Sequence, residues 1–271
     1  MGTYLDTIVA AHRATAERDE RSLDELLEGA GRCSPTRGFA VALSAGANLR
    51  VIAEIKRRSP SKGDLNPGLD PAATAAAFER GGAACLSVLT DAEFFSGSAG
   101  DLESARGACA LPVLRKDFTV DARDIADSRL MGADAILLIV AALDAAELRT
   151  FLGLAGDLGL DALVEVHDER ELDRAADAGA SIIGVNQRDL TTFEIDRELA
   201  VKLAPRMPDG AVTVAESGIR GVDDAITVAS AGYHAVLVGE SVVTSCDPVA
   251  AVGALAEVVR CPGRGGAPQC S

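Results

Sequence analysis

The chain has 271 residues, of which 48% are hydrophobic and 25% are charged. This composition is typical of a folded globular protein and excludes disordered and collagen-like chains. The formal net charge is −15 and the isoelectric point is near 4.6. A surface this acidic repels nucleic-acid phosphates and anionic lipids, so we expect no nucleic-acid or membrane partner, although a few local cations can still hold a small anionic ligand.

We expect neither a signal peptide nor a zinc site from this sequence. No segment approaches the roughly 20 apolar residues that span a bilayer, and the N-terminus has no basic region followed by an apolar run. The six cysteines show no CxxC spacing and lie far from the three histidines, which gives a zinc site little support. We expect a cytoplasmic, monomeric protein without a metal, in which Cys85 is a small core residue.

The first fifty residues have a helical pattern. Four residues recur on one helical face, namely Leu5, Ile8, Val9 and His12. Ser22 and Glu25 have the spacing of a capping box and predict a second helix start, and residues 32–40 are expected to be a connector. We predict that residues 1–48 form a helical extension packed on the domain that follows.

From residue 49 onward, short apolar segments alternate with amphipathic segments of helical length. The predicted strands are 51–55, 84–89, 112–114, 135–140, 162–166, 181–185, 212–215 and 235–238. The predicted helices include 71–80, 122–131, 142–158, 169–178, 197–203, 222–231 and 248–259. Strict alternation indicates a parallel sheet covered on both faces.

Eight such repeats favour one closed α/β barrel, a (β/α)8 TIM barrel over residues 49–260, with the helical extension before it. An open doubly wound sheet would be expected to carry GxGxxG after its first strand, and none is present. Residues 261–271 are rich in Pro, Gly and Cys without periodicity, which predicts a disordered tail.

The predicted strands end in polar residues, at the barrel face where active sites of this fold lie. Alternation along a strand places Glu54 and Lys56 on one face above Ile52, Lys116 above Leu114, and Glu165 above Leu163. Asn186 and Glu216 end two further strands. Each charge alone could be a solvated loop residue or a helix cap. Two lysines and three glutamates on one rim instead indicate an active site whose groups shift each other's pKa values.

A phosphate site is predicted by the loops after the seventh and eighth strands. Ser217-Gly218 and Gly239-Glu240 lie there, where backbone N–H groups of barrel enzymes often bind phosphate. We expect the backbone N–H of Glu240 to serve, with its carboxylate turned away. The alternative is that both pairs form simple tight turns. In the long loop 57–70, Lys62 is either a solvated charge or a contact for an anion.

Several sequence blocks resemble the indole-3-glycerol-phosphate synthase family of tryptophan biosynthesis. The blocks are EIKRRSPSKG at 54–63, LTD at 89–91, FSGS at 95–98, LRKDF at 114–118, LLIV at 137–140, LVEV at 163–166, NQRDL at 186–190 and AESG at 215–218. The resemblance extends over nearly the whole chain up to Arg260 and includes the helical extension.

The resemblance implies ring closure of 1-(2-carboxyphenylamino)-1-deoxyribulose 5-phosphate with loss of CO2 and water, without metal or organic cofactor. It implies that Lys116 is the general acid and Glu165 the general base. Lys56 would be a second cation, Glu54 and Asn186 would orient the lysines and the substrate, and Glu216 would line the same mouth. A neighbouring lysine is expected to lower the pKa of the acid.

The resemblance also implies which residues bind the substrate. Those near the phosphate are Ser59, Ser217, Gly218, Gly239 and Glu240, together with Lys56. Those near the anthranilate ring, its carboxylate and the adjoining cavity are Ser61, Phe95, Phe118, Leu137, Arg188, Leu190 and Leu237. On chemistry alone, an arginine suits a carboxylate, whereas both phenylalanines are more typical of a core than of a ligand site.

The strand-end residues disfavour two other functions. Phosphoribosylanthranilate isomerase is similar in fold but places a Cys base after its first strand and an Asp acid after its sixth, where this chain has Glu54-Ile55-Lys56 and Asn186. A catalytically silent barrel would be indicated by loss of Lys116 or Glu165, and both are present.

Overall fold

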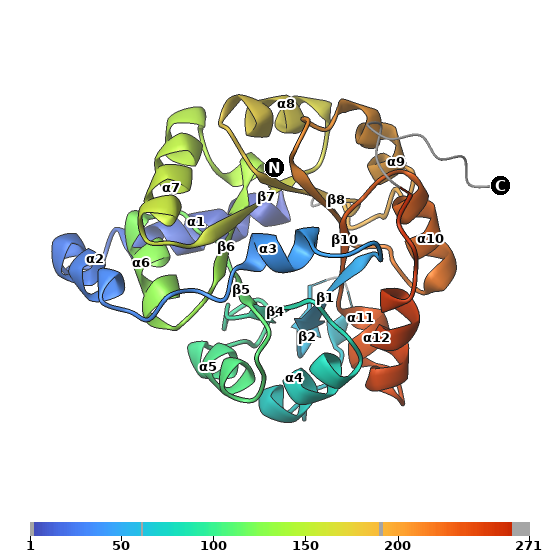
Figure 1. Ribbon diagram of the computed structural model, residues 1–271. Coiled ribbons are helices and arrows are strands. Elements are labelled where there is room, and N and C mark those ends of the chain that lie inside the picture. The colour runs from blue at the N-terminus through green and yellow to red at the C-terminus, as the bar shows by residue number, and fades with distance from the viewer. Residues whose placement is uncertain (1–2, 61, 190–191, 262–271) are drawn as a thin grey trace.

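A computed structural model of the chain describes residues 3–60, 62–189 and 192–261. Within these residues, eight parallel strands close into a barrel in the order β1-β10-β9-β8-β7-β6-β5-β4, ringed by helices (Figure 1). The strands are β1 (Arg50–Ile55), β4 (Cys85–Leu89), β5 (Val113–Lys116), β6 (Ala135–Ile139), β7 (Asp161–Val166), β8 (Ile182–Asn186), β9 (Val212–Glu216) and β10 (Ala235–Val238). The predicted (β/α)8 TIM barrel is confirmed.

Helices follow the strands and cover the outside of the barrel. They are α4 (Pro71–Arg80), α5 (Ala99–Gly107), α6 (Ala122–Leu130), α7 (Ala145–Asp157), α8 (Glu169–Asp177), α9 (Leu199–Leu203), α10 (Val222–Ser230), α11 (Glu240–Val243) and α12 (Pro248–Ala256). Aspartate carboxylates accept backbone N–H groups at the start of several of them, namely Asp70, Asp121, Asp144, Asp168 and Asp247. These caps explain where the helices begin and place acidic residues where the helix dipole favours them.

The buried apolar residues form two layers, one between sheet and helices and one inside the barrel. Ile52, Leu114 and Leu163 are fully buried in the inner layer, as strand alternation predicted. The side chains at alternate positions nearer the carboxyl ends of these strands therefore point into the mouth of the barrel.

The N-terminal residues cover both ends of the barrel. Helix α1 (Tyr4–Ala16) lies over the loops at the carboxyl ends of the strands, and α2 (Leu23–Gly31) packs on α6. Helix α3 (Phe39–Ser44) lies across the opposite end, as Figure 1 shows, and inserts Phe39 and Leu43 into the inner layer. The connector predicted at 32–40 is therefore too long, because α3 begins at Phe39 immediately after Gly38, whose φ is +73°.

Other boundaries differ from the sequence-based expectation by a few residues. The predicted helix 142–158 begins three residues later, because a 3-10 turn at Val140–Ala142 precedes the cap at Asp144. The predicted strand 135–140 ends at Ile139, and the predicted helix 248–259 ends at Ala256. A second 3-10 turn covers Ala204–Arg206.

The loop after β1 contains a short antiparallel pair of strands, β2 (Arg58–Ser59) and β3 (Gly63–Asp64). Among the described residues, no helix is long and apolar enough to cross a membrane. The predicted disordered tail lies outside the described residues except for Cys261.

Candidate active site

A cavity of about 380 Å³ opens at the carboxyl ends of the barrel strands. All the predicted site residues that the structure describes line it: Glu54, Lys56, Ser59, Phe95, Lys116, Phe118, Leu137, Glu165, Asn186, Arg188, Glu216, Ser217, Gly218, Leu237, Gly239 and Glu240. Ser61 and Leu190 lie outside the described residues. The structure thus brings strand ends from around the whole barrel to one chamber.

Lys116, the last residue of β5, lies at the centre of a charged cluster. Its Nζ donates to Oε2 of Glu165 at 2.7 Å and to Oε2 of Glu216 at 3.2 Å. The carboxylates are almost fully buried, with side-chain exposures of 3% and 2%, whereas Lys116 is 14% exposed. The ammonium group therefore lies between the two buried carboxylates and the open cavity.

This arrangement moves the pKa values of the three groups apart. Burial by itself would lower the pKa of Lys116, but Glu165, Glu216 and Glu54 outweigh it and raise that pKa. The expectation that a neighbouring lysine lowers it is wrong, because carboxylates and not a lysine surround the ammonium. Burial would raise the pKa of Glu165, but Lys116 and His167 hold it well below its usual range. The pKa of Glu216 is raised, chiefly by burial.

A second layer of contacts holds the charged cluster. The amide of Asn186 donates to Oε1 of Glu165 at 3.1 Å, and its Oδ1 accepts from the Ser217 hydroxyl at 2.8 Å. The ammonium of Lys56 contacts Oε1 of Glu54, two residues earlier on the same strand face. Each cation of the cavity floor thus has a buried carboxylate partner.

The loops after β9 and β10 form the opposite wall. Ser217 and Gly218 both have left-handed backbone, with φ of +61° and +78°. Gln187 fixes this turn by donating its side-chain amide to the Ser217 carbonyl at 2.8 Å. The Glu240 carboxylate contacts the Lys62 ammonium, so Lys62 is paired with a carboxylate and is not a lone solvated charge.

Aromatic rings form the third wall. The rings of Phe95 and Phe118 have centroids 6.1 Å apart, and His12 lies against Phe118 at 5.3 Å. Tyr4, Leu5 and Ile8 of α1 also line the cavity. The helical pattern of the sequence predicted the buried face of α1 but not the surface on which it packs.

A sequence model of the family described as indole-3-glycerol phosphate synthase matches residues 5–255. The chain belongs to this family. Indole-3-glycerol phosphate synthase 1 of Streptomyces coelicolor is 51% identical over 255 residues, which cover 93% of this chain and 94% of the relative. The synthase of Mycobacteroides abscessus is 48% identical over 94% of both chains. Membership of the indole-3-glycerol phosphate synthase family makes the chain a carboxy-lyase of tryptophan biosynthesis.

Among solved structures, the thiamine phosphate pyrophosphorylase of Pyrococcus furiosus is similar, with a TM-score of 0.59 over 76% of this chain and 93% of its own. Its sequence identity is 17%, so the likeness shows the barrel fold alone.

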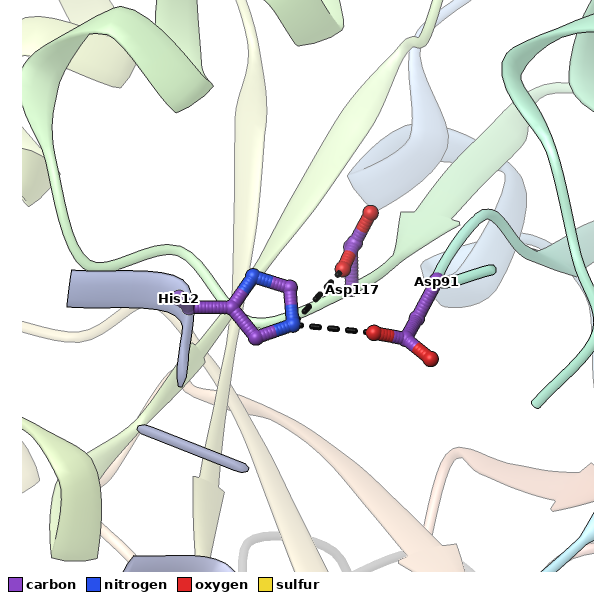
Figure 2. Close-up of side chains that lie close together, drawn as sticks. All are labelled: His12, Asp91 and Asp117. Carbon is purple, nitrogen blue, oxygen red and sulfur yellow. Dashed lines mark hydrogen bonds and ion pairs between the residues drawn. The ribbon is translucent and has the colours of Figure 1, made fainter. Parts of the chain in front are cut away.

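One group of side chains in this synthase-family chain has metal-like spacing, and the sequence did not reveal it. Figure 2 shows His12 of α1 facing Asp91 and Asp117, with Nε2 at 2.9 Å and 4.0 Å from their carboxylate oxygens. Every carboxylate oxygen already has a protein partner: Asp91 Oδ1 accepts from backbone N–H groups, and Asp117 accepts from Phe118 N and from Thr90 and Arg115 side chains. The group therefore acts as a hydrogen-bonded contact between α1 and the barrel.

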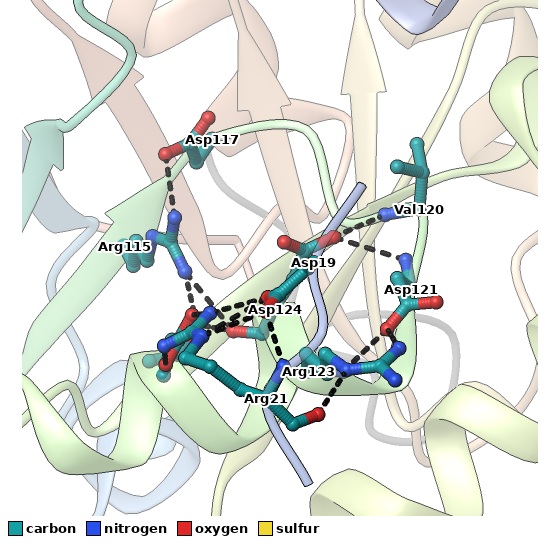
Figure 3. Close-up of polar contacts among 10 residues, drawn as sticks. Asp19, Arg21, Arg115, Asp117, Val120, Asp121, Arg123 and Asp124 are labelled. Carbon is teal, nitrogen blue, oxygen red and sulfur yellow. Dashed lines mark hydrogen bonds and ion pairs between the residues drawn. The ribbon is translucent and has the colours of Figure 1, made fainter. Parts of the chain in front are cut away.

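Arg115 connects this contact to α6 (Figure 3). Its guanidinium donates to Oδ2 of Asp117 at 2.9 Å and to the Asp124 carbonyl and Ser128 hydroxyl at 3.0 and 3.1 Å. On the same helix, Asp127 accepts two hydrogen bonds from Arg21 of the segment after α1. These contacts hold the N-terminal extension beside the cavity, and their sequence separations of up to 106 residues hide them from any local pattern.

Proposed function

We propose that this chain closes the pyrrole ring of 1-(2-carboxyphenylamino)-1-deoxyribulose 5-phosphate, giving indole-3-glycerol phosphate, CO2 and water. The observation that supports it most is the Glu165–Lys116–Glu216 cluster at the floor of a cavity with an aromatic wall. The raised pKa of Lys116 and the lowered pKa of Glu165 keep the proposed acid protonated and the proposed base ionised at neutral pH before the substrate binds.

In the proposed reaction, Lys116 donates a proton to the ketone oxygen while the aromatic carbon that bears the carboxylate attacks the ketone carbon. CO2 then leaves and its bonding electrons return to the ring. A second proton from Lys116 lets the new hydroxyl leave as water, while Glu165 removes the C–H proton that completes the pyrrole. Two protons are donated and one is taken up, so each turnover consumes one proton from solvent.

The remaining groups hold the acid, the base and the substrate in place. Asn186 orients Glu165, and Glu54 orients Lys56, which we place beside the substrate carboxylate or hydroxyl. Glu216 is the second partner of Lys116. A raised pKa makes Glu216 the carboxyl group that takes up a proton more readily, so Lys116 can leave it for the substrate.

We assign the two anionic ends of the substrate to opposite walls. The phosphate binds backbone N–H groups of Gly218, Gly239 and Glu240, with Ser59 and Ser217 beside it. The anthranilate ring lies between apolar side chains, and Arg188 meets its carboxylate. The ring wall includes Phe95, Phe118, Leu137 and Leu237.

The test is formation of indole product from the purified chain and the carboxyphenylamino-deoxyribulose phosphate, without added metal. The chain contains no Trp, so product fluorescence is measured against a weak background. We expect turnover by the wild type and a loss of at least about 10²-fold in kcat for Lys116→Met. Lys202→Met, which removes an exposed ion pair with Asp196, is the matched control and should retain full activity.

No product from folded wild-type protein would overturn the proposed reaction. Full activity of Lys116→Met would leave the reaction standing and overturn the assignment of the acid.

A further inference from the structure

The His167 side chain faces Glu165, the proposed base, but the proposed reaction assigns His167 no role. Its Nε2 is 3.3 Å from Oε1 of Glu165, an ion-pair distance, and has no hydrogen-bond partner although it is buried. On the other side of the ring, Nδ1 donates to Oε2 of Glu171 at 3.0 Å, and the His167 backbone N–H donates to the same oxygen at 2.7 Å. The imidazole is thus fixed at one nitrogen and directed at the base with the other.

The two oxygens of Glu165 have different surroundings. Oε2 faces Lys116, the group that must turn to the substrate, whereas Oε1 faces Asn186 and His167. When Lys116 engages the substrate, Oε2 becomes free to accept a proton. The contacts at Oε1 are then the ones that keep the carboxylate in place.

His167 lies outside the reaction cavity. Together with Glu171 it lines a second cavity, while Glu165 lines only the first; the two cavities share Leu5, Asn186, Arg188 and Ile195. The other charged groups around the second cavity are Asp6, Asp168, Arg188, Asp189, Glu194 and Asp196. His167 does not line the cavity in which we place the substrate, and the residue of that cavity that it faces is Glu165, so it acts on the proposed reaction through Glu165.

We propose that His167 is a positioning residue for the proposed base: as an imidazolium anchored by Glu171, it holds Oε1 of Glu165 and keeps that carboxylate ionised while Lys116 serves the substrate. This proposal rests on the proposed function of Glu165. The groups that face Glu165 are Lys116, Glu216, Asn186 and His167, and those that contact His167 are Glu165 and Glu171.

The protonation state fits this role. Burial by itself would lower the pKa of His167, but Glu165 and Glu171 outweigh it and raise that pKa to about 10. The imidazole therefore carries both protons at neutral pH, and its Nε2–H is available to Glu165. A cation at this distance lowers the pKa of Glu165, so its removal must raise that pKa.

Two substitutions of His167 separate the effect of its charge from the effect of its hydrogen-bond donor. Gln at 167 can place a neutral donor near the former Nε2, whereas Asn reaches only the former Nδ1. In His167→Gln and His167→Asn we expect the acid limb of the kcat/KM profile to move up by about one pH unit or more. At pH 7 we expect kcat to fall about tenfold further in the Asn variant than in the Gln variant, with KM within about twofold of wild type.

A third variant tests the anchor. Glu171→Gln removes the charge that keeps His167 protonated, so the pKa of His167 should fall from about 10 toward its usual value. We expect a new loss of kcat as pH rises above neutral in this variant. The matched histidine control is His234→Asn. His234 directly precedes β10 and accepts a hydrogen bond from the Thr213 backbone N–H, and its substitution should leave both limbs of the pH profile unchanged.

A merely structural histidine would lower activity without shifting the pH profile. The proposal would therefore be overturned if the pH profiles of the His167 and Glu171 variants superimposed on that of the wild type after scaling. A readout independent of turnover is ¹⁵N NMR of the three histidines. We expect His167 to be doubly protonated at pH 7 and to titrate at lower pH in Glu165→Gln. A neutral His167 at pH 7 would overturn the proposal even if the wild type proves inactive in the indole assay.

Discussion

Two glycines leave room for the buried carboxylates of the cavity. A Cβ at Gly184 of β8 would overlap Oε1 of Glu216, and a Cβ at Gly239 would overlap Oε1 of Glu54. Neither glycine has a left-handed φ, so the requirement at these positions is space and not backbone conformation. The cavity floor is therefore shaped by missing side chains as much as by charged ones.

Gly184→Ala is expected to push Glu216 away from its 3.2 Å contact with Lys116. We predict a fall in kcat of about tenfold and a loss of about 1–3 kcal/mol in the free energy of unfolding, because the new methyl group has no free space. Kinetics and urea unfolding measure both. The control is Gly156→Ala in α7, where a Cβ meets nothing within 4 Å and helix propensity favours alanine. Equal effects of the two substitutions would show that the close approach of Gly184 to Glu216 is not what limits this position.

At the scale of elements, the contact between His12 and Asp91 is one of those that join α1 to the barrel. Burial by itself would lower the pKa of His12, but hydrogen bonding to Asp91 and the charges of Asp117 and Asp91 outweigh it and raise that pKa. Since the folded-state pKa exceeds the unfolded value, the protonated form stabilises the fold. This contribution is complete below about pH 6.5 and is lost as pH rises through the raised pKa.

His12→Asn should therefore lower the free energy of unfolding more at pH 6 than at pH 9, by a difference of about 1 kcal/mol. Asp91, whose pKa is lowered although burial opposes the shift, stays ionised at both pH values. Urea unfolding of the variant and the wild type at the two pH values measures the difference. A pH-independent effect would mean that the proton on His12 is irrelevant to how α1 is held.

Helix α3 closes the end of the barrel opposite the cavity. Phe39 is fully buried in the inner layer, while Val41 on the same helix is 72% exposed. We expect Phe39→Ala to cost about 3–5 kcal/mol in the free energy of unfolding, and Val41→Ala less than about 0.5 kcal/mol. Thermal and urea unfolding of the pair measure this. Similar small losses in both variants would show that α3 is not part of the barrel core.

An element could be predicted when the residues that specify it are close together in the sequence. The eight strands and most outer helices were predictable because apolar segments and capping residues lie within a few positions of one another. Helix α3 was missed in part because six residues are too few to show a periodic pattern, and its glycine start resembles a turn. Parity along β1, β5 and β7 placed the catalytic candidates correctly in one mouth.

The contacts between elements were not predictable, for the same reason. His12 meets Asp91 across 79 residues, and Lys62 meets Glu240 across 178. The predicted direction of the Lys116 pKa shift was wrong because the partners of Lys116 are carboxylates from β7 and β9. Only the folded barrel shows that carboxylates and not cations surround its ammonium group.

For the whole molecule, the charge is distributed unevenly. The chain carries a net charge of −15, and some of its aspartates cap the outer helices. By formal charge, the described residues that line the cavity are six cations and five anions, a formal net charge of +1: Lys56, Lys62, Lys116, Arg188, Arg197 and Arg220 against Glu54, Asp117, Glu165, Glu216 and Glu240. The cavity therefore repels an anionic substrate less than the acidic chain as a whole does.

Residues 262–271 follow the barrel in the sequence. The described residues that line the cavity fall between Tyr4 and Thr244, and the family match ends at residue 255. Removal of residues 262–271 should therefore leave kcat, KM and Tm unchanged, because they follow the part of the chain that the family model matches and their sequence shows no helix or strand periodicity. Steady-state kinetics and thermal unfolding of the shortened chain test this. A clear fall in kcat or Tm would assign the final residues a role in closing the mouth or supporting the barrel, and would contradict the prediction that they form a disordered tail.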